Sequence, residues 1–280
     1  MAPPRARELV VPGGRLHYEV AGAGPEVVLL HEGISDRRMW DREFALLART
    51  HRLVRYDQRG YGGSLPATGP FSYVSDLRAV IDAVGFSRPV VVGPSIGSSI
   101  ALDYALAHPG TLAGLVLMAP GPPSGITPEM IPEGKEALDI DRRATAAIDQ
   151  AWSEGKVDQA IEYLRRFWAP ALEGEAREKF TTMVRENSAE IFGNSSAPLV
   201  EEPAPPAVER LKTLRVPTLI LFGDRDGPLI PVFAHFLARR IPGPQLRMIS
   251  GGDHLLNLSR PDEFLRALTD FLAAIPARKS

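Results

Sequence analysis

The sequence contains no cysteine, which excludes disulfide bridges, thiolate nucleophiles, zinc fingers and iron–sulfur clusters. It also has no basic excess: the formal net charge is −2, so no surplus of positive charge is available to neutralise the phosphates of a nucleic acid. Long apolar runs are missing as well. The longest, Leu115 to Ala119, is far too short to cross a membrane, and Met1 to Val20 holds no apolar core of signal-peptide length. We therefore expect a soluble, cytoplasmic protein that binds neither nucleic acid nor a membrane.

What is present is typical of a globular enzyme-sized chain. The 280 residues are 44% hydrophobic and 24% charged, values that exclude a disordered or fibrous protein. After an N-terminal hairpin over 9–20, short apolar strands alternate with amphipathic helices. Strands are predicted at 27–30, 53–56, 89–92, 112–118, 218–222 and 246–249, and helices at 38–48, 73–84, 96–107, 232–240 and 262–274. This alternation predicts an α/β fold, a mostly parallel twisted sheet with helices on both faces.

The middle of the chain breaks this pattern. Between residues 121 and 207 no convincing strand occurs, and helical periodicity is found near 134–151, 156–168 and 175–192. We therefore predict one α/β core, made of 1–120 and 208–280, that is interrupted by an all-helical insertion, 121–207.

One short motif carries the chemistry. Gly93-Pro94-Ser95-Ile96-Gly97 follows a buried apolar strand and opens a helix. A G-x-S-x-G match alone is weak, but strand–turn–helix is the context of a nucleophile elbow, in which a strained turn exposes the serine hydroxyl above a helix N-terminus. A turn rich in Gly and Ser without chemistry is the alternative. The motif favours Ser95 as a nucleophile.

A serine nucleophile needs a general base and a carboxylate that orients it. Of the six histidines, His254 alone lies in a loop between the last strand and the last helix, at the same sheet edge as Ser95. Asp224 and Asp226 both follow the predicted strand 218–222 at that edge. Asp226 is the preferred carboxylate, because Gly223-x-x-Asp226 lets the loop turn back toward the histidine, and Asp224 is the fallback. The sequence therefore predicts a triad of Ser95, Asp226 and His254.

The order Ser…Asp…His, together with the elbow, resembles the α/β-hydrolase fold superfamily. The segment from Asp57 to Ser64 is similar to the D-x-R-G-x-G-x-S loop of these proteins, and the segment from Arg260 to Phe264 is also similar to theirs. The resemblance implies the serine-nucleophile branch, esterase-like or enol-lactonase-like, and implies that the helical insertion is a cap, or lid. Serine at position 95 argues against epoxide hydrolases and haloalkane dehalogenases, which use a carboxylate.

The resemblance also implies an oxyanion hole. The backbone amides of Gly33 and Ile96 are its expected donors, with Ile34 as a second choice. This chain departs from the family at Glu32, where glycine is usual. Glu32 is expected to turn outward and pair with an arginine such as Arg37 or Arg59; the alternative is that it adjusts local charge or contacts substrate.

A second departure is Ser98, which stands where glycine is common and is either a packing residue or a pocket hydroxyl. Cap aromatics, among them Trp152, Phe167 and Trp168, could line a pocket, although helix packing is the commoner role for such residues. No metal or organic cofactor is expected, because the sequence has no H-E-x-x-H, dinucleotide-binding or P-loop motif.

The predicted function is hydrolysis of a small-molecule carboxylic ester or lactone through an acyl-enzyme on Ser95. Alternatives are hydrolysis of a carbon–carbon bond, a non-hydrolytic lyase or cyclase on the same fold, and a non-catalytic ligand receptor. Substrate identity and oligomeric state cannot be predicted.

Overall fold

The computed structural model describes residues 5–193, 200–201 and 203–275. Its centre is an eight-stranded sheet in the order β1-β2-β4-β3-β5-β6-β7-β8. The strands are β1 (Arg5–Val11), β2 (Gly14–Ala21), β3 (Glu26–Leu29), β4 (Arg52–Tyr56), β5 (Val90–Ser95), β6 (Gly114–Pro120), β7 (Thr218–Gly223) and β8 (Gln245–Ile249). The hairpin β1–β2 joins β4 in antiparallel pairing, and every later pairing is parallel. The predicted α/β fold is confirmed.

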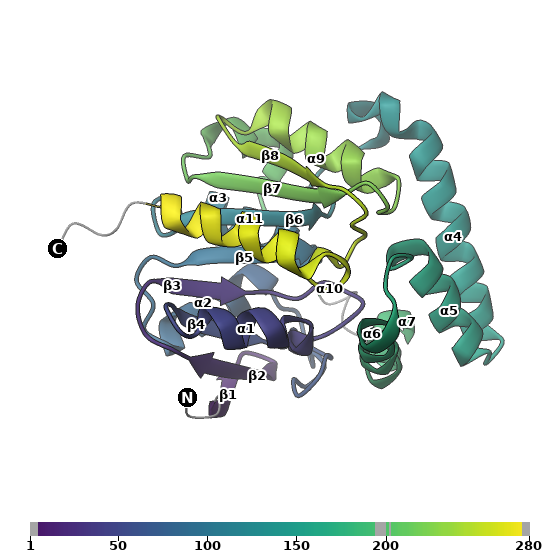
Figure 1. The fold of residues 1–280 in the computed structure, drawn as a ribbon, viewed down its shortest axis with the longest axis horizontal. Coiled ribbons are helices and arrows are strands. Elements are labelled where there is room, and N and C mark those ends of the chain that lie inside the picture. The colour runs from purple at the N-terminus through teal and green to yellow at the C-terminus, as the bar shows by residue number, and fades with distance from the viewer. Residues whose placement is uncertain (1–4, 194–199, 202, 276–280) are drawn as a thin grey trace.

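Helices cover both faces of the sheet. In Figure 1, α1 (Asp41–Leu47) and α11 (Pro261–Ala274) lie on one face, and α2 (Tyr73–Ala83) and α3 (Ile96–Ala107) lie on the other. The helix α9 (Leu229–Arg240) packs against β6, β7 and β8, and the short α8 (Ala207–Arg210) and α10 (Leu256–Ser259) complete the core. The central strands are buried along their length, β6 and β7 at every residue, as expected of parallel strands covered on both faces.

The helical insertion, defined here as α4 (Lys135–Ser153), α5 (Val157–Trp168), α6 (Gly174–Glu186) and α7 (Ser188–Gly193), follows β6 and precedes β7. It lies beyond the sheet edge toward which the parallel strands point (Figure 1). A second apolar cluster lies mostly within it, and Ile148, Ile161, Leu164, Phe180 and Val184 are among its buried members. Because parallel strands present their carboxyl ends to this edge, the insertion faces the loops in which this fold class builds its sites.

Two predicted helices differ from the observed ones. The segment 175–192 is two helices, because the chain breaks at Asn187, whose side chain leaves the insertion to bond with the core. The segment 38–48 begins as a 3-10 turn, η1 (Arg37–Trp40), before α1, because the side chain of Asp36 caps it by accepting the amide of Arg38. Part of the predicted insertion, residues 194–199 and 202, lies outside the described residues. Over the described ranges, no helix is both long and apolar enough to span a bilayer.

Candidate active site

Ser95 is the last residue of β5, and Ile96 is the first residue of α3. Its backbone is strained, with φ 47° and ψ −121°, a conformation that non-glycine residues rarely adopt. The flanking glycines are required by space: a Cβ at Gly93 would lie 2.2 Å from the carbonyl oxygen of Gly97, and one at Gly97 would lie 2.7 Å from the carbonyl oxygen of His31. The local geometry is therefore that of a nucleophile elbow.

Asp226 and His254 are joined directly. His254 Nδ1 donates to Asp226 Oδ1 over 2.9 Å, and both side chains are buried. The backbone amide of Gly227 donates to the same oxygen over 2.6 Å, which fixes the carboxylate. The fallback Asp224 does not reach the histidine: it accepts the amide of Gly251 over 2.6 Å and shapes the loop instead.

The surroundings of His254 favour its charged form. Burial opposes protonation, but the negative charge of Asp226, its hydrogen bond, and the charges of Glu32 and Asp253 together raise the pKa of His254 above its ordinary value. This is the direction expected where a carboxylate stabilises an imidazolium.

Ser95 and His254 lie at the same edge of the sheet, because β5, β6, β7 and β8 run parallel and each residue stands at or just after the carboxyl end of its strand. No hydrogen bond joins their side chains within the described part of the chain. Catalytic hydrogen bonds are often long before substrate binds. In the described residues the hydrogen bond between Asp226 and His254 is therefore formed, and the one between Ser95 and His254 is not.

The loop after β3 is held by His31. The amide of Gln58 donates to His31 Nε2 over 2.8 Å, so Nε2 carries no proton, and Nδ1–H donates to the carbonyl oxygen of Glu32 over 2.6 Å. Both ring nitrogens are therefore used, and the neutral tautomer is set by its partners. The Gln58 side chain donates back to the His31 carbonyl over 2.7 Å, which locks the backbone that leads into Gly33.

Gly33 and Ile96 are neighbours: a Cβ at Gly33 would lie 3.7 Å from Ile96 Cγ2. The hydroxyl of Tyr61 donates to the Gly33 carbonyl over 2.9 Å, which orients that peptide. The amide of Ile96 is the first of its helix and has no intrahelical acceptor. The Ile34 amide, the second-choice donor, already donates to Glu32 Oε2 over 2.9 Å and is therefore occupied.

The expectation that Glu32 turns outward is wrong. Its side chain is fully buried, and Oε1 has no hydrogen-bond partner within the described residues. The two arginines considered as partners are engaged elsewhere, Arg37 with Asp57 and Glu19 and Arg59 with Asp76. The bond from the Ile34 amide holds the carboxylate inside, so Glu32 contributes negative charge close to the predicted oxyanion hole.

Ser98 is a structural residue of the elbow. Its hydroxyl donates to the Ser95 carbonyl over 2.6 Å and accepts the Gly121 amide over 3.0 Å, and the side chain is buried. It therefore ties the elbow to the chain that leaves β6, and it is not a pocket hydroxyl.

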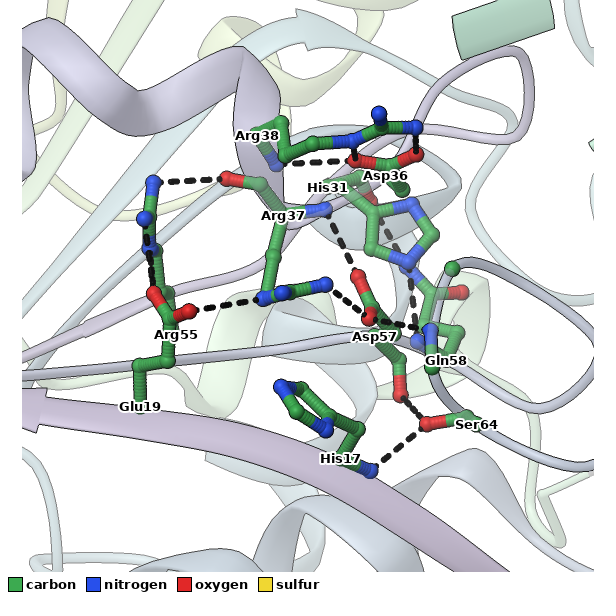
Figure 2. Close-up of polar contacts among 12 residues, drawn as sticks. His17, Glu19, His31, Asp36, Arg37, Arg38, Arg55, Asp57, Gln58 and Ser64 are labelled. Atoms are coloured by element: carbon green, nitrogen blue, oxygen red, sulfur yellow. Dashed lines mark hydrogen bonds and ion pairs between the residues drawn. The ribbon is translucent and has the colours of Figure 1, made fainter. Parts of the chain in front are cut away.

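Figure 2 shows a polar network that joins the loop after β3 to the loop after β4. Asp57 accepts the Arg37 amide over 2.9 Å, the Arg37 guanidinium over 2.5 Å and the Gly63 amide over 2.8 Å. Ser64 donates to the Asp57 carbonyl over 2.6 Å. The loop 57–64 thus holds the loop 31–40 in place, which assigns the D-x-R-G-x-G-x-S segment a supporting role.

A cavity of about 500 Å³ adjoins Gly33. Its walls come from the core and from α4 and α7: Gly33, Tyr61, Thr145, Asp149, Trp152, Glu190, Ile191 and Phe192. Trp152 stacks on Phe192 with ring centroids 4.8 Å apart. Another cavity, of about 170 Å³, lies at the opposite edge of the sheet and includes His108 and Thr213.

The predicted pocket aromatics have separate positions. Trp152 lines the larger cavity, Trp168 contacts the His254 ring at 4.5 Å between centroids, and Phe167 packs edge-on against Trp168. Tyr61, Asp149 and Glu190 were not predicted. Tyr61 stands within the recognisable loop 57–64, whereas nothing local marks the other two. No group of His, Asp or Glu suited to a metal ion occurs among the residues the structure describes.

Comparison with known proteins extends this geometry. Residues 27–267 match the alpha/beta hydrolase family. A putative non-heme chloroperoxidase from Synechocystis sp. is 28% identical over 269 residues, covering 92% of this chain and 94% of that protein. A 2-hydroxymuconate semialdehyde hydrolase from Pseudomonas putida is 26% identical over 302 residues, covering 100% of this chain and 98% of that protein.

Solved structures agree. The esterase RhEst1 from Rhodococcus sp. ECU1013 superposes with a TM-score of 0.78 at 26% identity, covering 98% of this chain and 99% of that one. The enol-lactonase from Burkholderia xenovorans LB400 has the same fold, with a TM-score of 0.74 at 23% identity over 95% of this chain and 100% of that one. The similarity to the hydrolases and esterases named above supports a hydrolase activity for this protein. Because the family model matches most of its length, and the elbow and the Asp226–His254 pair agree with it, the chain belongs to the alpha/beta hydrolase family.

Proposed function

We propose that this protein is a serine hydrolase that cleaves a small-molecule carboxylic ester or lactone through an acyl-enzyme on Ser95. The observation that carries the proposal is the strained Ser95 at the start of α3, on the same sheet edge as the hydrogen-bonded pair Asp226–His254. Such an arrangement supplies a nucleophile, a base and the group that orients the base.

In the proposed reaction, His254 takes the hydroxyl proton of Ser95 as its oxygen attacks the substrate carbonyl. The amides of Gly33 and Ile96 stabilise the oxyanion of the tetrahedral intermediate. His254 then gives the proton to the departing alkoxide, which leaves the acyl group on Ser95. A water molecule, deprotonated by the same His254, attacks the acyl-enzyme and releases the acid. Asp226 keeps the imidazole in the required tautomer and stabilises its charged form.

The helical insertion fits the role of a cap, with residues 121–207 as the cap and 1–120 and 208–280 as the core. Two contacts support this: Trp152 and Phe192 line the cavity that adjoins Gly33, and Trp168 lies on His254. A small molecule seated in that cavity would lie beside Gly33, one of the two proposed oxyanion donors.

The test is hydrolysis of a 4-nitrophenyl acyl series by the wild type and Ser95→Ala, with phosphonate labelling followed by intact mass. We expect a single phosphonate adduct on the wild type, no adduct on the variant, and a loss of activity in the variant by about 10⁴-fold or more. If the serine takes no label and the variant keeps its activity, the proposal fails.

Carbon–carbon bond hydrolysis is the second candidate, favoured by the similarity to the Pseudomonas putida hydrolase of a semialdehyde. A vinylogous dicarbonyl substrate tested beside the esters separates the two. A lyase or cyclase without an acyl-enzyme is excluded if an acyl group is trapped on Ser95.

A further inference from the structure

Trp168, the last residue of α5, contacts His254 through both its backbone and its side chain. Its backbone carbonyl accepts the amide of His254 over 3.1 Å. Its indole lies against the imidazole of the same residue, with ring centroids 4.5 Å apart and planes inclined by 47°. An aromatic contact at this distance restricts the plane of the imidazole ring.

The indole also packs tightly against Gly227. A Cβ at this position would lie 2.7 Å from Cζ3 of Trp168, closer than any ordinary contact. The Gly227 amide is one of the two donors to Asp226 Oδ1, the other being His254 Nδ1. Trp168 therefore lies against His254 and against Gly227, the residue that follows Asp226 and donates to its carboxylate.

The residues next to His254 also contact the insertion. Asp253 is fully buried, and its Oδ2 accepts the amide of Ala171 over 2.9 Å. On the other side of the histidine, Leu255 is buried in the apolar cluster of the insertion. The stretch that follows α5 is thus attached to the residues before and after His254, so the insertion cannot lift away at this end without moving the histidine.

We propose that Trp168 is a positioning residue for His254: its indole fixes the ring plane of the imidazole and keeps water from the Asp226–His254 hydrogen bond. The inference rests on the proposed function, since His254 is the base there. It assigns the end of α5 a role in holding the base of the proposed reaction.

The first test does not use substrate. The proton shared between His254 Nδ1 and Asp226 gives a low-field proton NMR resonance, and its exchange with water reports shielding. We expect a protected resonance in the wild type, its loss in Trp168→Ala, and its return in Trp168→Phe, whose ring covers the same bond. Phe86→Leu is the matched control, because Phe86 is buried in the main core and does not belong to the apolar cluster that contains Leu255; it should lower the Tm and keep the resonance.

The second test is kinetic. Trp168→Ala should lower kcat by about 10²-fold, the cost of a misplaced catalytic group, with little change in KM. Gly227→Ala should lower kcat in the wild type by displacing the indole, and should have little further effect in Trp168→Ala, where nothing remains to be displaced.

Two results would overturn the inference: a Trp168→Ala variant that keeps both the protected proton and its kcat, or Gly227 and Trp168 effects that simply add. Failure of the proposed function has a different signature. In that case the wild type takes no phosphonate on Ser95, while the NMR result still reports whether Trp168 shields the pair.

Discussion

Asn187, in the insertion, donates through Nδ2 to Oδ2 of Asp36 in the core over 2.8 Å, although the two residues are 151 positions apart. Its Oδ1 accepts the Gly62 amide over 2.7 Å, and Nδ2 also donates to the Met183 carbonyl. One buried amide therefore joins two core loops to the insertion. Asn187→Ala should destabilise the protein by about 1–3 kcal/mol, because it leaves a buried carboxylate oxygen and an amide short of a partner. Urea denaturation measures this, and an unchanged midpoint would contradict it.

The same carboxylate makes stability depend on pH. Burial opposes ionisation of Asp36, but hydrogen bonds from Arg38 and Asn187 lower its pKa to about 2. A depressed pKa in the folded state stabilises the protein above the unfolded value near 3.8, and this stabilisation is lost as pH falls from there toward 2. The contribution at neutral pH is about 2 kcal/mol. Comparing the acid unfolding of the wild type and Asp36→Asn checks it: the variant should be less stable at pH 7, with a difference that shrinks below pH 4.

Activity should rise with pH through the titration of His254. The base must be neutral, and Asp226 is the main charge that raises the pKa of His254 against the effect of burial. The kcat/KM profile should therefore have its acid limb above the ordinary histidine value of about 6.5. Asp226→Asn should move that limb to lower pH and reduce kcat by about 10⁴-fold. A limb that stays in place in Asp226→Asn would show that another group titrates.

Glu32 should also affect the pH at which the acid limb of the kcat/KM profile falls. Its buried charge also raises the pKa of His254, so Glu32→Gln should shift the limb to lower pH. The amide oxygen of glutamine can still accept the Ile34 amide, so the loop should keep its shape. Circular dichroism and Tm control for folding, and coincident pH profiles in a folded variant would refute the expectation.

The larger cavity should disfavour anionic substrates. Asp149 and Glu190 line it, and among the residues that the structure describes no Lys, Arg or His contributes to its walls. A negatively charged acyl chain, as in mono-4-nitrophenyl succinate, should be cleaved with a lower kcat/KM than 4-nitrophenyl butyrate. Asp149→Asn should reduce the difference in kcat/KM between the two esters. Added salt should reduce it too, because Asp149 is exposed and salt screens its charge. Equal rates on the two esters would exclude this selectivity.

The elbow glycines should tolerate no side chain. Gly93→Ala would place Cβ against the backbone of Gly97, which cannot move without displacing α3. We expect a loss of stability of more than about 3 kcal/mol, whereas Gly69→Ala, with open space around it, should stay within about 0.5 kcal/mol. Thermal unfolding of the two variants side by side makes the comparison, and equal Tm values would contradict it.

The order of strands and helices was predictable because it depends on local pattern. Apolar runs such as Val90 to Val92 specify buried strands, and the loops that follow β7 and β8 had to meet at one edge. Asp226 was preferred to Asp224 because the spacing Gly223-x-x-Asp226 lets the loop turn back toward the histidine, and the structure bonds His254 to Asp226. The position of Ser98 and the burial of Glu32 were not predictable in this way.

The break at Asn187 and the burial of Glu32 depend on partners distant in the sequence or on the conformation of a loop. Asn187 breaks a helix because Asp36 and Gly62 bind it, and no periodicity in α6 or α7 shows this. Glu32 is buried because the Ile34 amide turns back toward it, a detail of loop conformation that composition does not encode. A charged residue in a loop is usually solvated, and this general tendency led to the wrong expectation.

The apolar cluster of the insertion is not made by the insertion alone. Leu255, which follows His254 directly, is one of its buried members, and Leu258 packs against both this cluster and the main core. A cluster that includes Leu255 is not complete until the core segment that follows β8 has folded. The insertion and the sheet are therefore expected to form a single cooperative unit, in which local opening of α5 and α6 carries the loop of His254 with it.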